Sequence, residues 1–291
     1  MENINYQHFL ITRFNLKQDN WVNDKHSLPL LGESENWLKK RFELFENFCL
    51  PSVKSQSNKN FKWFVYFSID TPDPYKEIIK SIQFDFPIFF PKFIPSMNEL
   101  VKSIKSDINI ECEALNNSIV ITTRLDNDDA LHEDFIKSIQ SCILRNRITK
   151  GILDLPCGFC LKVEPTIILS STIQFSNAFI SYIEPFISDV SLLTVFGKEH
   201  PKWVYSDRTY FLNHKRLWMQ IIHENNVLNE IDGLLLNNTK YLNYFNFKKE
   251  IYLAHINYDK ILIGNYLKAP IYFFKKTLKK TWIKRRMILN K

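Results

Sequence analysis

The chain has 291 residues, of which 45% are hydrophobic and 24% are charged, so it has enough apolar side chains for a sizeable core and is not a disordered protein. Its 38 Lys and Arg residues against 31 Asp and Glu residues give a formal net charge of +7, which raises the question of a nucleic-acid partner. Glycine accounts for 6 residues, and neither G-x-G-x-x-G nor G-x-x-x-x-G-K-[ST] occurs, which excludes the common glycine-built phosphate loops.

The basic excess lies at the C-terminal end of the chain. Residues 261–291 contain nine Lys or Arg residues and no Asp or Glu, so residues 1–260 together carry a net charge of −2. The sequence therefore predicts a near-neutral body, residues 1–258, followed by a basic tail, residues 259–291. The body shows no recognisable nucleic-acid-binding module, so we expect no nucleic-acid partner.

Hydrophobic patterning predicts strands that alternate with helices. In chain order, strands are expected at residues 8–14, 61–69, 87–93 and 118–124, and helices at 34–50 (ending before Pro51), 74–82, 98–115 and 133–147. Residues 151–163 and 166–173 are expected to form a hairpin or two adjacent strands, and strand-like segments follow at 217–223 and 251–255. This alternation is typical of an α/β fold with a mostly parallel central sheet flanked by helices.

Targeting signals and cysteine usage favour a cytoplasmic location. The N-terminus has neither the basic region nor the apolar region of a signal peptide, and the sequence has no apolar run of 18 residues. The five cysteines, an odd and scattered set, suit a reducing compartment better than a disulfide framework. Cys157 and Cys160 are expected to be two packed thiols, since a single C-x-x-C pair in a strand-like segment is weak evidence for a redox or zinc site.

The most informative segment is Thr122–His132, with the sequence TTRLDNDDALH. Asp126, Asp128 and Asp129 lie within four residues, directly after a predicted strand, and ligands of open α/β sheets bind beyond the carboxyl ends of strands. Carboxylates this close repel each other unless a cation is present, and their oxygens suit Mg²⁺ or Mn²⁺, which in turn suit a diphosphate. The alternative is an acidic turn that caps the following helix.

The segment RLDNDD resembles the DxD-type metal motif of nucleotide-sugar glycosyltransferases with the GT-A fold. Further stretches resemble the rhamnosyltransferase family of bacterial polysaccharide loci: HFLITRFN (8–15), RFELFENFCLPSVKSQ (41–56), FKWFVYFSIDTP (61–72), ITTRLDNDDALHEDFI (121–136), NAFISYIEP (177–185) and WMQIIHENN (218–226). The resemblance covers about residues 8–258 and implies a Rossmann-like GT-A fold. It also implies transfer of a sugar, such as rhamnose from dTDP-rhamnose, to a glycan or lipid-linked acceptor in cell-surface polysaccharide synthesis.

The resemblance also implies roles for individual residues. The nucleotide sugar is expected to contact Thr12, Arg13, Phe14, Arg41, Asp70, Arg124, Asp126 and Asp129, and a divalent Mn²⁺ or Mg²⁺ is expected to bind Asp126, Asp128 and His223. An inverting enzyme needs a carboxylate base, for which Asp207 is preferred over Glu184. Alternatives stay open: a solvated helix charge for Arg41, a helix cap for Asp70 and an ion pair for either base.

The basic tail has the pattern of an amphipathic helix over Ile271–Leu289. Ile271, Phe274, Leu278, Trp282 and Leu289 fall near one stripe of a helical wheel, and Lys275, Lys276, Lys279, Lys280 and Arg286 spread over the rest. This pattern predicts that residues 268–291 bind an anionic membrane surface, which places the protein peripherally on the inner face of the cell membrane. The alternative is a helix docked on the body with a basic face toward solvent.

Two other classes of function fit parts of the sequence. A nucleotidyltransferase also uses paired aspartates and Mg²⁺, but it needs a glycine-rich phosphate loop near the first strand, and HFLITRFN has none. A non-enzymatic membrane adaptor would use the body as a binding module and the tail as an anchor. Nucleotide binding that depends on a divalent cation distinguishes an enzyme from such an adaptor.

Overall fold

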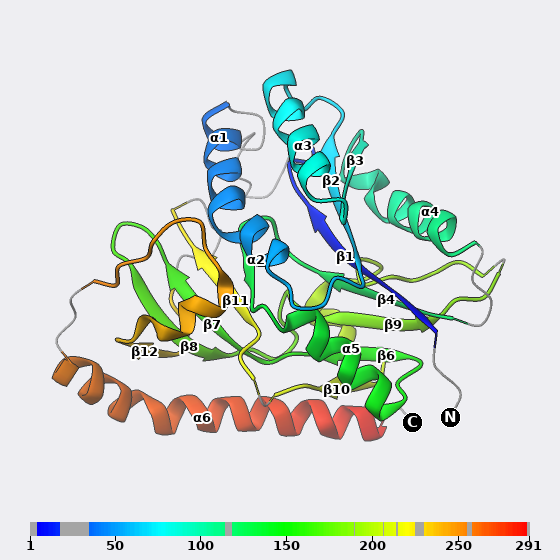
Figure 1. Cartoon of the computed structure of the whole chain (residues 1–291). Helices are drawn as coiled ribbons and strands as arrows, with labels where there is room; N and C mark the ends of the chain where they lie inside the picture. Colours follow the sequence, from blue (N-terminus) through cyan, green and yellow to red (C-terminus); the bar gives the residue numbers. More distant parts are fainter. Residues whose placement is uncertain are drawn as a thin grey trace, which may run out of the picture.

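The computed structural model describes residues 5–17, 35–113, 118–188, 190–205, 207–213, 215–224, 230–254 and 258–289, which form two sheets with helices around them (Figure 1). The larger sheet has seven strands: β1 (Tyr6–Arg13), β2 (Lys62–Ser68), β3 (Phe89–Ile94), β4 (Ile119–Arg124), β6 (Gly151–Asp154), β9 (Ser181–Pro185) and β10 (Thr209–Phe211). Their order is β10-β6-β9-β4-β1-β2-β3. Within it, β9 runs antiparallel to its neighbours β4 and β6, and the other neighbours pair in parallel. The predicted α/β fold class with a mostly parallel central sheet is therefore confirmed.

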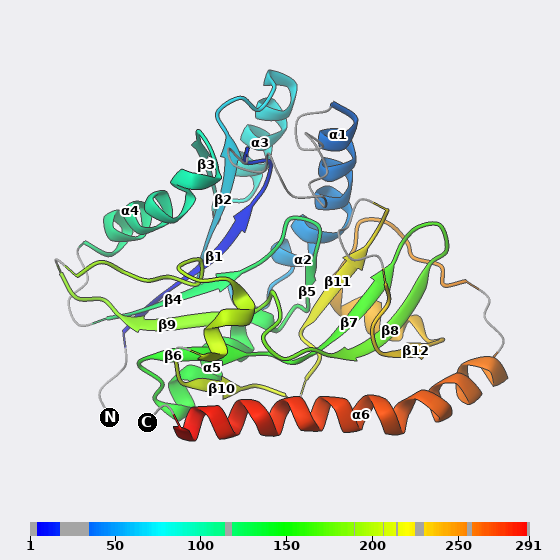
Figure 2. The same cartoon turned by 180° about the vertical axis from the view of Figure 1, so that it is seen from behind.

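Helices cover both faces of this sheet because successive strand side chains point in opposite directions. Leu10 of β1 joins a cluster with α1 (Glu35–Leu44), α2 (Leu50–Lys54), α3 (Asp73–Asp85) and α5 (Phe135–Asn146). Its neighbours Phe9 and Ile11 join the opposite cluster, with α4 (Leu100–Cys112). Figure 2 shows α3 and α4 on opposite sides of β2 and β3. The central strands are thus buried on both faces, as their nearly continuous apolar sequences predict.

The smaller sheet has the order β12-β8-β7-β11-β5. Its strands are β5 (Ala130–Leu131), β7 (Cys157–Lys162), β8 (Ile168–Ile173), β11 (Trp218–Ile222) and β12 (Leu234–Leu236). The chain leaves the large sheet at Arg124, the end of β4, and enters the small sheet at Ala130, the start of β5. The acidic segment 125–129 is therefore the connection between the two sheets.

Short helices complete the connections between the main elements. A π-helical turn, Phe45–Cys49, joins α1 to α2, and 3₁₀ turns span Met97–Glu99, His200–Tyr205 and Thr239–Phe245. The predicted end of the first helix before Pro51 is wrong, because the helical run continues through this π-helical turn into α2, which contains Pro51.

Three other expectations have different outcomes. The segment 251–255 is not a strand where the structure describes it, residues 251–254, and His255 lies outside the described residues. The β7–β8 hairpin forms as expected, with antiparallel pairing, whereas β6 belongs to the large sheet. Cys157 and Cys160 are free thiols three residues apart on β7, so they point to opposite faces and do not form a pair.

The basic tail belongs to one long helix, α6 (Tyr258–Leu289), with Pro270 in its interior. This helix runs along the side of the molecule where β10 and β12 lie (Figures 1 and 2). It contacts β12 and the 3₁₀ turn His200–Tyr205. Within the described ranges, no helix is both long enough and apolar enough to cross a membrane.

Candidate active site

The acidic segment is fixed at the carboxyl ends of β1 and β4. The backbone N–H of Leu125 donates to the carbonyl of Ile11 (3.0 Å), which extends the parallel pairing of the two strands. The side-chain amide of Asn127 donates to the carbonyl of Phe14 (3.1 Å), just beyond the end of β1. The site residues therefore stand on two buried, neighbouring strands, at the sheet edge where α/β proteins bind ligands.

Asp128 is the centre of a buried charged cluster. Its Oδ2 accepts a hydrogen bond from Arg41 Nη1 (2.5 Å) and lies 3.0 Å from Nε2 of His223. The side chains of Asp128, Arg41 and His223 are 9%, 15% and 4% exposed. Arg41 also donates to Asn127 Oδ1 (3.2 Å) and lies over the ring of Trp37. Arg41 is therefore part of the site rather than a solvated helix charge.

Asp126 pairs with different arginines. Both of its carboxylate oxygens lie 3.0 Å from Arg124 Nη2, and Arg13 Nε lies 3.8 Å from Oδ1. Burial disfavours the ionised form, but the charges of Arg124 and Arg13 prevail and hold the pKa of Asp126 below its usual value. Arg124 Nη1 also contacts His200 Nδ1 at 3.2 Å. Asp126 is thus a charged group that fixes two arginines at the strand ends.

Asp129 turns toward the protein interior. Its Oδ1 accepts a hydrogen bond from the backbone N–H of Ile221 on β11 (2.9 Å). Burial, followed by the negative charges of Asp128 and Asp126, raises the pKa of the Asp129 carboxyl well above its usual value. Because His223 comes two residues after Ile221, this bond holds the end of β11 beside the acidic segment. Asp129 Oδ1 contacts the protein backbone here, and its expected contact with the nucleotide sugar stays a prediction.

The expected set of three metal ligands is only partly assembled. Among the residues that the structure describes, no group of three His, Cys, Asp or Glu side chains is placed to hold a metal ion. Asp128 and His223 bring one oxygen and one nitrogen to the same point, whereas the carboxylate of Asp126 faces Arg124 and Arg13. Mg²⁺ commonly binds through one or two carboxylates, with substrate phosphates and water completing its coordination, and Asp128 supplies one such carboxylate. The pair therefore fits a metal shared with a diphosphate, and Asp126 does not belong to it.

Three residues expected to contact the nucleotide have other partners. Thr12 is fully buried, and its hydroxyl oxygen accepts a hydrogen bond from the indole of Trp63 (3.0 Å). Phe14 is 6% exposed and packs against the rings of Phe42, Phe45 and Phe67. Asp70 is exposed and paired with Lys17 (2.9 Å), and the N-cap of α3 is Pro72, so Asp70 is not a helix cap either. Thr12 and Phe14 are thus turned into the core, whereas Asp70 follows β2 at the sheet edge where the parallel strands β1 and β4 also end.

Glu184 does not face the acidic segment. It lies on the antiparallel strand β9 opposite Val120, near the start of β4, whereas the acidic segment follows the end of β4. The four residues from Val120 to Arg124 span about 13 Å of strand. Both Glu184 oxygens accept backbone N–H bonds, from Leu193 and Thr194 (2.8 Å each). The expectation of Glu184 as a base is therefore corrected: it is a buried acceptor that shapes the loop after β9.

Asp207 is also placed toward the amino ends of the parallel strands. It lies two residues before Thr209 of β10. Thr209 is paired with Ile152 of β6, Ile152 with Tyr182 of β9, and Tyr182 with Thr122 in the middle of β4. Its Oδ2 accepts a hydrogen bond from the hydroxyl of Tyr182 (3.1 Å). The expected base is thus on the wrong part of the sheet for an acceptor bound beside Asp128. Among the described residues, no ion pair of Asp207 with Arg208 or Lys202 is seen, and Lys202 pairs with Glu199 (3.1 Å).

Two residues of the cluster were not selected by sequence reasoning. Asn127 lies inside the quoted motif and bridges Phe14 to Arg41, so its position between two aspartates was an available signal. His200 contacts Arg124 from 76 residues away, which no local pattern reveals. Burial first, and then the charge of Arg124, lowers the pKa of His200 to about 4, so His200 is neutral at physiological pH.

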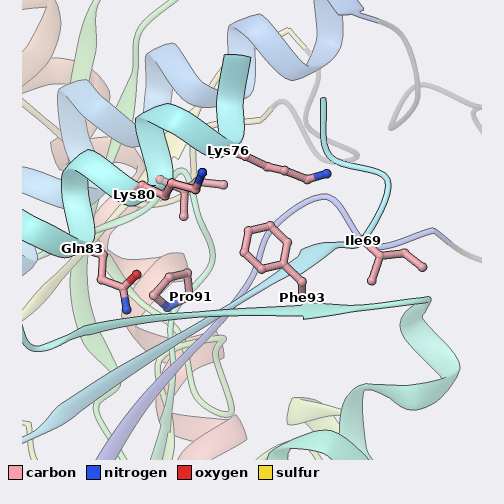
Figure 3. A pocket seen from close by; sticks show the side chains of 7 residues that line it. Ile69, Lys76, Lys80, Gln83, Pro91 and Phe93 are labelled. Carbon is pink, nitrogen blue, oxygen red and sulfur yellow. The ribbon is translucent and has the colours of Figure 1, made fainter. Parts of the chain in front are cut away.

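A separate pocket of about 300 Å³ lies between α3 and β3 (Figure 3). Ile69, Pro91 and Phe93 make its lining largely apolar, with Lys76 and Lys80 on the side of α3. These lysines pair with acidic residues one turn away on the same helix. None of the expected site residues lines this pocket.

Comparison with known proteins identifies the family. The model of a family described as "Putative rhamnosyl transferase" matches residues 7–233. The chain belongs to this family. The range shared by the rhamnosyl transferase family contains every expected site residue and ends before α6. The predicted family resemblance is therefore confirmed, and α6 lies outside the matched range.

Similar solved structures are more distant, and no curated protein matches this chain in sequence. The rhamnosyl transferase family chain is similar to S. aureus TarS 1–349, with 10% identity, a TM-score of 0.40, and coverage of 74% of this chain and 60% of TarS. The same protein in complex with UDP gives 10% identity, a TM-score of 0.41, and coverage of 75% and 61%. For a 4-diphosphocytidyl-2C-methyl-D-erythritol synthase, the identity is 11% and the TM-score is 0.30, and the match covers 62% of this chain and 76% of the synthase. The chain spans about three fifths of the length of both TarS structures.

Proposed function

We propose that this protein is a glycosyltransferase that moves a sugar, rhamnose, from a nucleoside-diphosphate donor to a glycan or lipid-linked acceptor in cell-surface polysaccharide synthesis. The observation that carries the proposal is the buried Arg41–Asp128–His223 cluster, held at the carboxyl ends of parallel strands in a member of the rhamnosyl transferase family. Rhamnose follows the description of the family. The acidic segment and the arginines around it match the charge of a nucleoside diphosphate and its cation.

The arginines are the groups of this chain suited to the donor's phosphates. Arg13 ends β1 and is 40% exposed, so its guanidinium is accessible to a bound anion. Arg124 ends β4 and is held by Asp126, which fixes the direction of its planar fork. Arginine forms paired hydrogen bonds to phosphate oxygens, which compensates for the absence of a glycine-built phosphate loop in the sequence.

A divalent cation, Mn²⁺ or Mg²⁺, is proposed to bind Asp128 and His223. When bound, such a cation neutralises the charge that develops on the leaving diphosphate. The chain's own residues prepare this pair: Arg41 holds one oxygen of Asp128, and Asp129 fixes the backbone of β11 ahead of His223. The first bond is partly buried and the second is fully buried, so the pair is positioned before any ligand arrives.

The acceptor is proposed to be presented at the inner face of the cell membrane, where α6 would make contact. This location agrees with a helix that carries basic and apolar side chains together and is not apolar enough to cross a bilayer. The location and the sugar transfer are separable parts of the proposal, and each has its own experiment.

Calorimetric titration with UDP, GDP and dTDP, each with and without Mn²⁺, tests the nucleotide site. We expect one nucleotide to bind in a cation-dependent manner, and the matching nucleotide-rhamnose then to be turned over. Asp128→Asn should lose both signals, while Asp73→Asn, at an exposed position on α3, serves as a matched control. Binding without any need for a cation would remove the metal from the proposal, and binding of none of the three nucleotides would reject it. Transfer of a nucleotidyl group from a nucleoside triphosphate would support the nucleotidyltransferase alternative instead.

A further inference from the structure

Helix α6 docks on the body through one narrow stripe. Ile261 and Ile283 are buried, and the hydroxyl of Tyr272 accepts a hydrogen bond from the backbone N–H of Ile173 (2.7 Å). Lys276 pairs with Asp232 (2.9 Å), Lys279 donates to the carbonyl of Phe175, and Asn265 bonds Leu235. The positions of this stripe are spaced by three, four or seven residues, which is one or two helical turns. This spacing places them on one face of the helix, so the docked face is fixed over almost its whole length.

A second, apolar stripe lies outside the docked face. Its six residues are 41–66% exposed: Ile263, Leu267, Ile271, Phe274, Leu278 and Trp282. They also recur every three or four residues, so they form one continuous ridge, which we call the α6 ridge. From Ile263 to Trp282 the ridge is about 28 Å long. A solvent-exposed apolar surface of this extent marks a site of contact with a protein or a membrane.

The charges on α6 decide between these partners. Lys268, Lys275, Lys284 and Arg285 are exposed around the ridge, and between Tyr258 and Leu289 the sequence has a single acidic residue, Asp259. A second copy of α6 packed against the first would bring cations against cations. An anionic bilayer offers the opposite charge and an apolar layer just below it, which matches cations that flank apolar side chains.

We propose that α6 lies flat on an anionic membrane, with the α6 ridge among the lipid headgroups and the exposed cations against the lipid phosphates. The inference rests on the proposed location at a membrane and is independent of the proposed sugar transfer. It assigns the contact to one face, and it extends that face to Ile263, ahead of the 268–291 segment expected from sequence. The cations of the docked stripe, such as Lys276, hold the helix on the body instead.

Deletion of residues 268–291 cannot test this proposal cleanly. It would remove Tyr272, Lys276, Lys279 and Ile283, which bind the helix to Ile173, Asp232 and Phe175 of the body, so lost membrane binding and lost folding would be confused. Substitution of exposed ridge residues leaves the docked stripe intact. Phe274 is 64% exposed and Leu278 is 54% exposed, so acidic side chains at both positions are compatible with the fold.

The experiment is co-sedimentation of the full chain with vesicles of phosphatidylcholine alone or of phosphatidylcholine mixed with phosphatidylglycerol. We expect binding to the anionic vesicles only, a loss of at least about tenfold in Phe274→Glu/Leu278→Glu, and a similar loss in Lys275→Glu/Lys284→Glu. Phe84→Glu on α3 is the matched control, because Phe84 is 88% exposed and lies outside α6.

Three outcomes would overturn the proposal. They are the absence of binding to anionic vesicles, wild-type binding by the ridge variant, and a wild-type dimer in sedimentation velocity that the ridge variant converts to a monomer. The last result would assign the ridge to a second copy of the chain. Nucleotide binding, measured on the same ridge variant by calorimetry, should be unchanged, so failure at the membrane and failure of the proposed sugar transfer are distinguishable.

Discussion

The Asp128 cluster and the α6 ridge invert the usual distribution of side chains in opposite ways. In the cluster, ionisable groups are buried, with Asp128 at 9% and His223 at 4% exposure, whereas on the ridge Phe274 is 64% exposed. Burying charge and exposing large apolar groups both cost free energy unless they are compensated. Compensation is internal: Arg41 faces Asp128, and the neighbouring Asp126 and Asp129 have Arg124 and a backbone donor. The ridge side chains are still 41–66% exposed in the folded chain, so the cluster is assembled in advance and the ridge is suited to an outside partner.

The largest expected effect concerns Asp128. Asp128→Asn keeps the shape of the side chain but removes the charge that Arg41 and His223 face, so sugar transfer should fall by about 100-fold or more. Turnover of the nucleotide sugar measures this, and circular dichroism checks the fold. Retained turnover would show that the buried charge does not serve the reaction. The Asp128 cluster would then be a structural feature and not a preassembled active site.

His223 is expected to have the next largest effect. His223→Gln keeps a polar side chain at the end of β11 but removes the imidazole nitrogen, so the cation concentration for half-maximal activity should rise roughly tenfold or more. A titration of activity with Mn²⁺ measures the shift. An unchanged cation requirement would separate His223 from the metal and leave it as a hydrogen-bond partner of Asp128.

Asp129 should affect stability through the hydrogen bond from Ile221. Asp129→Ala leaves that buried N–H without its acceptor and should lower the free energy of unfolding by about 1–3 kcal/mol. Asp129→Asn retains an oxygen acceptor and should restore most of this loss. Urea unfolding of the two variants measures the difference, and equal destabilisation by both would instead point to the charge of Asp129.

The smallest effects are expected at the two carboxylates toward the amino ends of the strands. Asp207→Asn keeps an acceptor for the Tyr182 hydroxyl and should leave turnover within about twofold of wild type. Glu184→Gln should leave turnover similar and cost about 1 kcal/mol of stability, because one of its two backbone bonds is lost. A loss of 100-fold or more in either variant would restore that residue as the catalytic base.

Much of the fold could be predicted from the sequence, because strands and helices follow from local apolar patterns. The strands around residues 8–14, 61–69 and 118–124 form close to their expected positions, as do α3 and α5. Residue placement at the end of β1 was harder to predict. Arg13 reaches the site while its neighbours Thr12 and Phe14 are buried, because both faces of this strand are covered and the sequence does not show which direction opens to a ligand.

The candidate site shows the same division. The acidic segment was evident from three aspartates after a buried strand, but its partners Arg41 and His223 are 87 and 95 residues away from Asp128. The direction of β9, which carries Glu184 to the far end of the sheet, is a property of strand pairing rather than of its own sequence. Long-range pairing depends on the whole fold, so no local pattern contains it.

Helix α6 shows most clearly which properties follow from the sequence and which from the tertiary structure. The sequence by itself determined a basic helix with an apolar stripe, since helical periodicity and side-chain charge are local properties. The tertiary structure alone decided that this stripe faces outward, because the body offers its contacts to a different stripe, with Ile261, Tyr272 and Ile283. Which face of a helix packs inward depends on what lies across from it, and that is decided by segments far away along the chain.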